Sequence, residues 1–263
     1  MTLRLTGKTA LVTGSTSNIG AAIAMAFAAE GAAVVVSGRD PERGKQVVAA
    51  IEADGGTAVF LRADLDGSPE ASAALARGAI HALGGRIDIL VNNAGIFPAS
   101  TTPDTDGATF DRVFGVNVKA PFFLTQAVVA NMLESGGTLE SGGGVVINLG
   151  SWIARLAVPM GGVYSATKGA LETLTRVWAA EFGARGIRVN AISPGVIRPS
   201  GLEPGEETPG DGLMLSAPAG AAGHPDAIAA AAVYLASDEA RFTHGATLDV
   251  DGGRVNVAVA APA

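Results

Sequence analysis

The feature that most constrains this chain is a regular alternation of short apolar runs with longer segments of helical periodicity. The run Ala33–Val36 is apolar at every position, so a strand formed by it must be covered on both faces. An earlier segment carries Ile19, Ile23 and Phe27 at helical spacing, which predicts an amphipathic helix. Strands buried on both faces and separated by helices predict a parallel sheet with helices on each side.

The same alternation continues along the whole sequence. The predicted strands are 8–13, 33–36, 57–62, 88–92, 145–149, 187–192 and 246–250. The predicted helices are a first one that ends at Gly31, and then 41–54, 69–83, 110–117, 120–133, 163–182 and 225–236. We therefore expect an α/β fold with a doubly wound, parallel seven-stranded sheet, Rossmann-like, with helices on both faces. No linker or internal repeat interrupts the pattern, so a single domain over residues 1–263 is expected.

Charge and composition narrow the range of partners. The net charge is −7 and no basic cluster is present, which argues against nucleic acid and anionic membranes as partners. The chain has no cysteine and its three histidines, at 81, 224 and 244, are scattered, so neither a disulfide nor a metal site is expected. The N-terminus has no secretory or membrane-spanning pattern, and we expect a soluble, cytoplasmic protein.

A glycine-rich turn, TGSTSNIG over residues 13–20, joins the first predicted strand to the first predicted helix. Glycines at such a turn allow the backbone to approach a pyrophosphate, whose charge the N-terminus of the helix stabilises. The position of the turn directly after the first strand predicts a dinucleotide site at the carboxyl edge of the sheet.

A tyrosine and a lysine four residues apart give the most informative chemical signal. Tyr164 and Lys168 lie in a predicted helix, and this spacing places them on one face, one turn apart. A phenol has a pKa of about 10, so it needs a neighbouring cation to act as an acid or base at neutral pH. Ser151 follows a predicted strand and can donate a hydrogen bond to a substrate oxygen as charge develops there.

These motifs resemble those of the short-chain dehydrogenase/reductase family, over residues 5–253. Thr13, Gly14 and Gly20 match the family's T-G-x-x-x-G-x-G pattern, whereas Asn18 replaces the middle glycine; asparagine tolerates a positive φ better than most residues. The family's catalytic set is matched at Asn117, Ser151, Tyr164 and Lys168.

The members that the chain resembles are 3-oxoacyl-carrier-protein reductases and glucose dehydrogenase-like enzymes. The resemblance implies hydride transfer between a nicotinamide cofactor and a carbonyl/alcohol pair, with Tyr164 as the general acid/base. Ser151 would polarise the substrate oxygen, Lys168 would supply the cation, and Asn117 would hold a water in a proton relay.

The resemblance also implies the cofactor contacts. They are Gly14, Ser15, Thr16, Asn18, Ile19, Gly20, Arg39, Asp64, Leu65, Asn92, Ala94, Gly95, Tyr164, Lys168, Pro194, Gly195 and Ile197. NAD-preferring relatives carry a carboxylate where this chain has Gly38, and Arg39 follows it. Because a guanidinium pairs well with phosphate, NADP(H) is favoured, while NAD(H) stays possible.

Two other functions stay open: an NAD-dependent alcohol or sugar dehydrogenase, and a nucleotide-binding sensor or scaffold without turnover. The substrate is expected to be a small carbonyl compound or alcohol, such as a 3-oxoacyl thioester, a ketone, a steroid-like alcohol or a sugar lactol. Val158, Met160, Gly161 and residues 202–215 are expected to line a moderately apolar pocket.

Two further expectations concern segments outside the catalytic motifs. Residues 196–222 are expected to form a mobile substrate loop, with an ordinary solvated loop as the alternative. Relatives pair through the helices that correspond to 120–133 and 163–182, which implies a homotetramer or homodimer. The apolar tail 255–263 either packs at a subunit boundary or frays.

Overall fold

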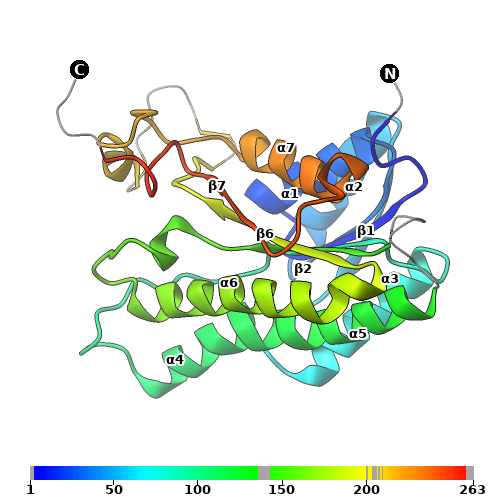
Figure 1. Cartoon of the computed structure of the whole chain (residues 1–263), viewed down its shortest axis with the longest axis horizontal. Coiled ribbons are helices and arrows are strands. Elements are labelled where there is room, and N and C mark those ends of the chain that lie inside the picture. The colour runs from blue at the N-terminus through cyan, green and yellow to red at the C-terminus, as the bar shows by residue number, and fades with distance from the viewer. Residues whose placement is uncertain are drawn as a thin grey trace.

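The computed structural model describes residues 3–135, 143–199, 201–202, 206, 208 and 210–258. Within these residues, parallel strands form one seven-stranded sheet with helices on both faces (Figure 1). The strands are β1 (Thr9–Val12), β2 (Ala33–Gly38), β3 (Thr57–Arg62), β4 (Ile89–Asn92), β5 (Val145–Leu149), β6 (Arg188–Pro194) and β7 (Thr247–Val250). Their order is β3-β2-β1-β4-β5-β6-β7, which confirms the doubly wound sheet. The order reverses between β1 and β4, where ligands bind in open sheets of this kind.

The predicted strands are confirmed, and two of them run further than their apolar runs indicate. β2 continues through Ser37 to Gly38, in register with Leu61 and Arg62 of β3, and β6 continues to Pro194. These extra residues lie at the carboxyl ends of the strands. They carry the sheet to the edge where the candidate site forms.

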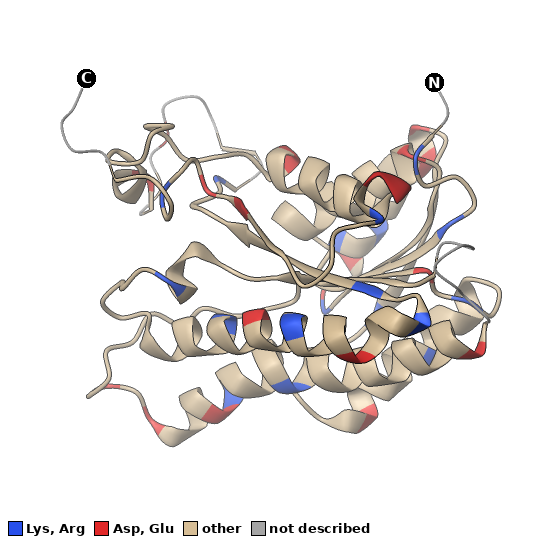
Figure 2. Cartoon of the chain, in the orientation of Figure 1, with Lys and Arg blue, Asp and Glu red and all other residues tan. Residues whose placement is uncertain are grey.

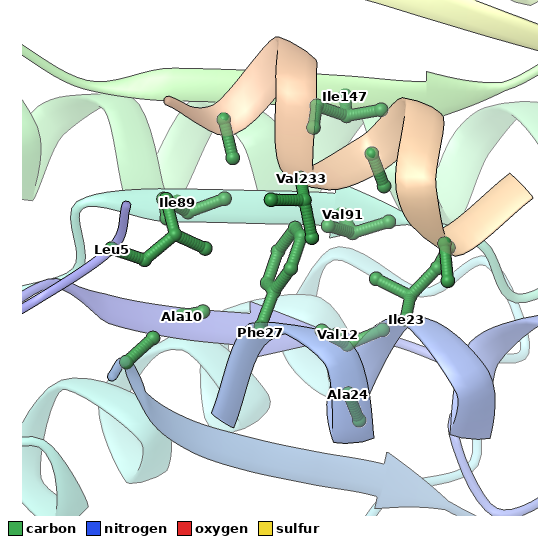
Figure 3. Close-up of a cluster of buried hydrophobic side chains, with 14 of the residues drawn as sticks. Leu5, Ala10, Val12, Ile23, Ala24, Phe27, Ile89, Val91, Ile147 and Val233 are labelled. Atoms are coloured by element: carbon green, nitrogen blue, oxygen red, sulfur yellow. The ribbon is translucent and has the colours of Figure 1, made fainter. Parts of the chain in front are cut away.

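Two layers of helices cover the sheet. α1 (Asn18–Ala29), α2 (Pro41–Ala53) and α7 (Pro225–Ala236) lie on one face, and α3 (Pro69–Ala82), α4 (Gly107–Phe114), α5 (Ala120–Glu134) and α6 (Gly162–Phe182) lie on the other (Figure 1). Figure 3 shows Phe27 of α1 and Val233 of α7 packed over Ile89 and Val91 of the sheet. Figure 2 shows acidic and basic residues interspersed over the described chain, without a basic run.

The helix that crosses beneath β4 and β5 contains a wider turn. α4 and α5 were expected to be separate helices, but a π-helical turn over Gly115–Lys119 joins them into one continuous helix, Gly107–Glu134. Length and composition alone would let this helix span a membrane, yet half of its most apolar window is buried, as in the core helices of soluble proteins. π turns are frequent at functional sites, and this one carries Asn117.

The expected substrate loop is described in part. At the start of the loop, Ile197 forms an isolated parallel β-bridge with Gly223. Arg198 N donates to Gly223 O at 2.9 Å. A short helix, Asp211–Met214, follows. Positions 200, 203–205, 207 and 209 of the loop, and 259–263 of the tail, lie outside the described residues.

A buried ladder of polar side chains ties the centre of the sheet to two helices. Asn92 and Asn148 are paired in register at the carboxyl ends of β4 and β5. Asn92 Nδ2 donates to Asn148 Oδ1 at 2.9 Å and to Thr125 Oγ1 of α5 at 3.0 Å. Asn148 Nδ2 donates to Thr175 Oγ1 of α6 at 2.9 Å. The ladder therefore fixes the strand ends against the helices that border the site.

Replacing Asn148 with alanine should destabilise the fold, because Asn92 and Thr175 would each lose a buried partner. We expect the free energy of unfolding to fall by about 2–3 kcal/mol, measured by urea denaturation. Gln46→Ala removes an exposed side-chain amide from α2, is the matched control and should change it by less than about 0.5 kcal/mol. An Asn148→Ala protein as stable as the control would show that the ladder contributes nothing.

Candidate active site

The glycine-rich turn packs directly on the segment that follows β4. Gly14 has a φ of 61°, and a Cβ there would lie 2.9 Å from Ala94 Cα. A Cβ on Gly20 would lie 2.3 Å from the Gly14 carbonyl oxygen, so neither position has space for a side chain. Asn18 adopts a φ of 48°, which confirms that it accepts the left-handed conformation of this turn.

The start of α1 is suited to an anion. Ser17, the N-cap residue, makes no capping hydrogen bond with its side chain, so the first N–H groups of the helix stay available. Asn18 Oδ1 is buried and has no hydrogen-bond partner among the described residues. A tight glycine cradle and uncapped N–H groups together fit the pyrophosphate of a dinucleotide.

A pocket of about 450 Å³ runs from this turn along the carboxyl ends of β2, β3 and β4. The expected cofactor residues that line it are Gly14, Thr16, Arg39, Asp64, Leu65, Ala94 and Gly95. Its other lining residues are Ser17, Ser37, Gly38, Ala63, Asp66, Ile96, Arg112 and Val116. Ser37, Gly38 and Ala63 directly follow predicted strands, a signal that could have found them. Arg112 and Val116 come from the continuous helix Gly107–Glu134, which no local pattern links to the turn.

Several expected cofactor residues lie outside this lining. They are Ser15, Asn18, Ile19, Gly20, Asn92, Pro194, Gly195 and Ile197, besides Tyr164 and Lys168. Ser15 is fully buried: its hydroxyl donates to Val12 O at 2.6 Å and accepts from Ser37 N at 2.9 Å. Asn92 is likewise engaged inside the fold by the polar ladder. Their side chains hold strand ends together, and direct contact with a cofactor stays a prediction for all these residues.

Helix α6 brings Tyr164 and Lys168 to the carboxyl end of β5. Lys168 Nζ donates to Leu149 O at 2.7 Å and lies 5.4 Å from the centroid of the Tyr164 ring. The Tyr164 hydroxyl shares a hydrogen bond with the side chain of Ser151. Three of the four expected catalytic side chains are therefore adjacent, although Ser151 comes from a different element.

Asn117 joins this group from the π turn. Its Oδ1 accepts from Ile96 N at 2.9 Å, and its Nδ2 donates to Ile96 O at 3.0 Å and to Thr167 Oγ1 at 3.2 Å. A Cβ on Gly95 would lie 3.4 Å from Asn117 Oδ1 and 3.6 Å from Lys168 Nζ, so Gly95 lies between the pocket and these two side chains. The Asn117 side chain is engaged with protein groups, and its part in a water relay stays a prediction.

Burial shifts the pKa values of both Lys168 and Tyr164. The Lys168 side chain is almost inaccessible, and its desolvation lowers the pKa of the ammonium group from 10.5 to about 8. Burial raises the pKa of the Tyr164 phenol above its usual value, while the hydrogen bond with Ser151 lowers it. Near neutral pH the lysine is therefore a cation and the tyrosine holds its proton, the forms needed for proton donation.

A second polar cluster, missed by the sequence analysis, supports the segment that carries Ser151. The Arg155 guanidinium donates to Ser193 Oγ at 3.0 Å and pairs with Asp249 of β7. Its Nε also lies 3.6 Å from Glu172 Oε1 of α6, and burial raises the pKa of that carboxyl group. The cluster ties α6, β6 and β7 to the turn after β5.

The depressed pKa of Lys168 makes stability depend on pH. The unfolded chain holds this proton up to pH 10.5 and the folded protein only to about 8, so stability should rise between these values. The gain is on the order of 3 kcal/mol, and Lys168→Met should lack it in urea denaturation across this range. Lys45→Met, at an exposed position of α2, is the control and should retain the gain. If the stability of Lys168→Met and of the control changed with pH in the same way, Lys168 would not have the lowered pKa that burial predicts.

Comparisons with known proteins agree with this site. Residues 14–254 match the family model described as enoyl-(acyl carrier protein) reductase. The chain is 39% identical over 251 residues to D-threitol dehydrogenase of Mycolicibacterium smegmatis, covering 95% of this chain and 94% of that protein. It is 35% identical over 252 residues to cyclopentanol dehydrogenase of Comamonas sp., covering 95% and 98%. A solved structure of a short chain dehydrogenase/reductase family protein superposes with a TM-score of 0.84 at 43% identity, covering 97% and 100%. The chain therefore belongs to the short-chain dehydrogenase/reductase family and is an oxidoreductase acting on CH–OH groups.

Proposed function

We propose that this protein is an NADP(H)-dependent oxidoreductase that interconverts a small carbonyl compound and a secondary alcohol, with Tyr164 as the general acid/base. The observation that carries this proposal is the meeting of Tyr164, Lys168 and Ser151 beside the glycine-lined pocket. A bound nicotinamide supplies the hydride in reduction and accepts it in oxidation.

The protein's own residues handle the proton and the developing charge. In reduction, Tyr164 donates its phenolic proton to the substrate oxygen, and Ser151 donates a hydrogen bond to the same oxygen. The ammonium group of Lys168 stabilises the phenolate that remains, because an opposite charge at this range favours the ionised form. In oxidation the same groups act in reverse, with the phenolate accepting the proton of the alcohol.

The preference for NADP(H) rests on the carboxyl ends of β2 and β3. A Cβ on Gly38 would lie 2.7 Å from Thr16 Cγ2, so the carboxylate that selects NAD would displace Thr16. Arg39 lines the pocket, and Arg62 Nε donates to Arg39 O at 3.4 Å. Among the described residues no carboxylate forms an ion pair with either arginine. Two unneutralised cations at this corner favour the 2′-phosphate of the adenosine.

We further propose that the protein is a homodimer or homotetramer in the cytoplasm. An exposed apolar groove of about 620 Å³ runs along α5 and α6, with Phe122, Ala170 and Leu174 among its lining residues. Val177 of α6 is also exposed. Pairing of α5 and α6 between subunits would cover the groove and Val177. The cysteine-free sequence fits a reducing compartment, and residues 196–222 are the proposed substrate loop.

Tyr164→Phe should lower kcat by about 100- to 10,000-fold, because the substrate oxygen loses its proton donor. The dissociation constant for NADPH, measured by cofactor fluorescence, should change by less than about threefold, since the aromatic ring is kept and only its hydroxyl is lost. Tyr234→Phe removes the hydroxyl of the other tyrosine and is the matched control, with activity unchanged. Substantial turnover by Tyr164→Phe would reject the assigned role.

Arg39→Asp should invert the cofactor preference, because a carboxylate repels a 2′-phosphate and accepts from a ribose hydroxyl. We expect the dissociation constant for NADPH to rise by about 10- to 100-fold and that for NADH to fall. Arg43→Ala removes an exposed arginine that pairs with Asp40 and serves as the control. An unchanged ratio of the two constants in Arg39→Asp would mean that Arg39 does not read the phosphate.

A further inference from the structure

A half-exposed phenylalanine contacts Tyr164, and a half-exposed methionine lies in the segment that leads to it. Phe97 is 51% exposed, and its ring centroid lies 4.7 Å from that of Tyr164. Met160 is 50% exposed and lies in the segment just before α6, four residues before Tyr164. Apolar surface left open beside a reacting group is available for a ligand to cover.

The backbone that leads to Phe97 is held in place by Asn117. The Asn117 amide accepts from the N–H of Ile96 and donates to its carbonyl, so the backbone at Ile96 is held from both sides. Ile96 also lines the candidate cofactor pocket. Phe97 therefore lies next to a pocket residue in sequence and next to Tyr164 in space. A backbone held in advance favours binding, because less conformational entropy is lost when a ligand covers the Phe97 ring.

Met160 is held in an unusual backbone conformation. Its φ is 69°, and among the described residues the only other non-glycine position with a positive φ is Asn18, in the glycine-rich turn. The Met160 carbonyl accepts from Ser100 N at 2.9 Å, which joins its loop to the loop that carries Phe97. Left-handed conformations at non-glycine residues persist where the surroundings impose them, and they cluster at ligand sites.

Several hydroxyl groups in the loop that carries Phe97 are already engaged. Ser100 Oγ lies 2.9 Å from Thr105 Oγ1, which donates to Thr101 O at 2.7 Å. Thr101 Oγ1 in turn donates to Asp104. These side chains satisfy one another, and they offer little to the extra hydroxyl groups of a sugar or polyol.

We propose that Phe97 and Met160 form an apolar rim that selects substrates whose reacting carbon belongs to an apolar ring or chain, over sugars and polyols. This inference rests on the proposed function and names its substrate class. An apolar ring covers both side chains, whereas a polyol must place hydroxyl groups against them and lose hydrogen bonds to water without replacement. Relatives at 39% and 35% identity are named for a polyol and for a cyclic alcohol, so identity alone does not decide the class.

The test compares cyclic ketones with a small ketose. Wild-type kcat/KM should rise about fourfold per methylene from cyclopentanone to cycloheptanone, and should exceed that for erythrulose by at least about tenfold. Phe97→Ala should lower kcat/KM for cyclohexanone by about 10- to 30-fold, chiefly through KM, and change that for erythrulose by less than about threefold. Phe97→Leu should recover most of the loss. Phe242→Ala removes a fully exposed phenylalanine from the loop before β7 and should change neither value.

Two outcomes would overturn the rim. One is a wild-type preference for erythrulose, and the other is an equal loss for both substrates in Phe97→Ala, which would mean that the ring only positions Tyr164. Binding gives a readout that is independent of turnover: cyclohexanol should bind the complex of Tyr164→Phe with NADP⁺ at least about tenfold more tightly than erythritol, measured by calorimetry. Equal binding would also overturn the rim. Full turnover by Tyr164→Phe would instead reject the proposed function and leave this binding comparison interpretable.

Discussion

The site depends on a single ammonium group enclosed by the fold. Lys168 Nζ is held on the carbonyl oxygen of Leu149, at the last residue of β5, and this contact sets helix α6 against the sheet edge. The same contact fixes Tyr164 one turn earlier, where its hydroxyl reaches Ser151. Burying a cation is costly, which is why burial lowers the pKa of Lys168, and the proposed proton transfer gives this charge a use.

The parallel sheet explains how residues distant in sequence meet at this cation. Every strand ends at the same edge, so the turns after β1, β4 and β5 are neighbours in space although they are far apart along the chain. Gly14 packs on Ala94, Gly95 adjoins Lys168, and the π turn brings Asn117 onto the segment after β4. The buried hydrogen bond between Asn92 and Asn148 joins the carboxyl ends of β4 and β5.

Much of this arrangement could be predicted because local patterns encode it. Continuous apolar runs give strands covered on both faces, and a spacing of four gives Tyr164 and Lys168 a common helix face. Asn18 was correctly expected to accept a positive φ, since that preference belongs to the residue itself.

What sequence patterns missed depends on contacts between distant segments. Ser15 carries no local sign that its hydroxyl would join β1 to β2, and nothing near Arg155 indicates that it pairs with Asp249. The π turn was read as a break between two helices, because the wider turn shows only in the hydrogen bonding of the folded helix. The apolar rim likewise appears only when the loops that carry Phe97 and Met160 are brought together.

Direct titration of the Lys168 ammonium group tests the central claim, that the fold buries this cation beside Tyr164. The chain has four lysines, so labelling their ε-carbons with ¹³C gives few nuclear magnetic resonance signals, and Lys168→Met identifies the one that belongs to Lys168. We expect this signal to titrate near pH 8, because burial disfavours the charged form. Titration at about pH 10.4, the ordinary value for lysine, would contradict the buried cation.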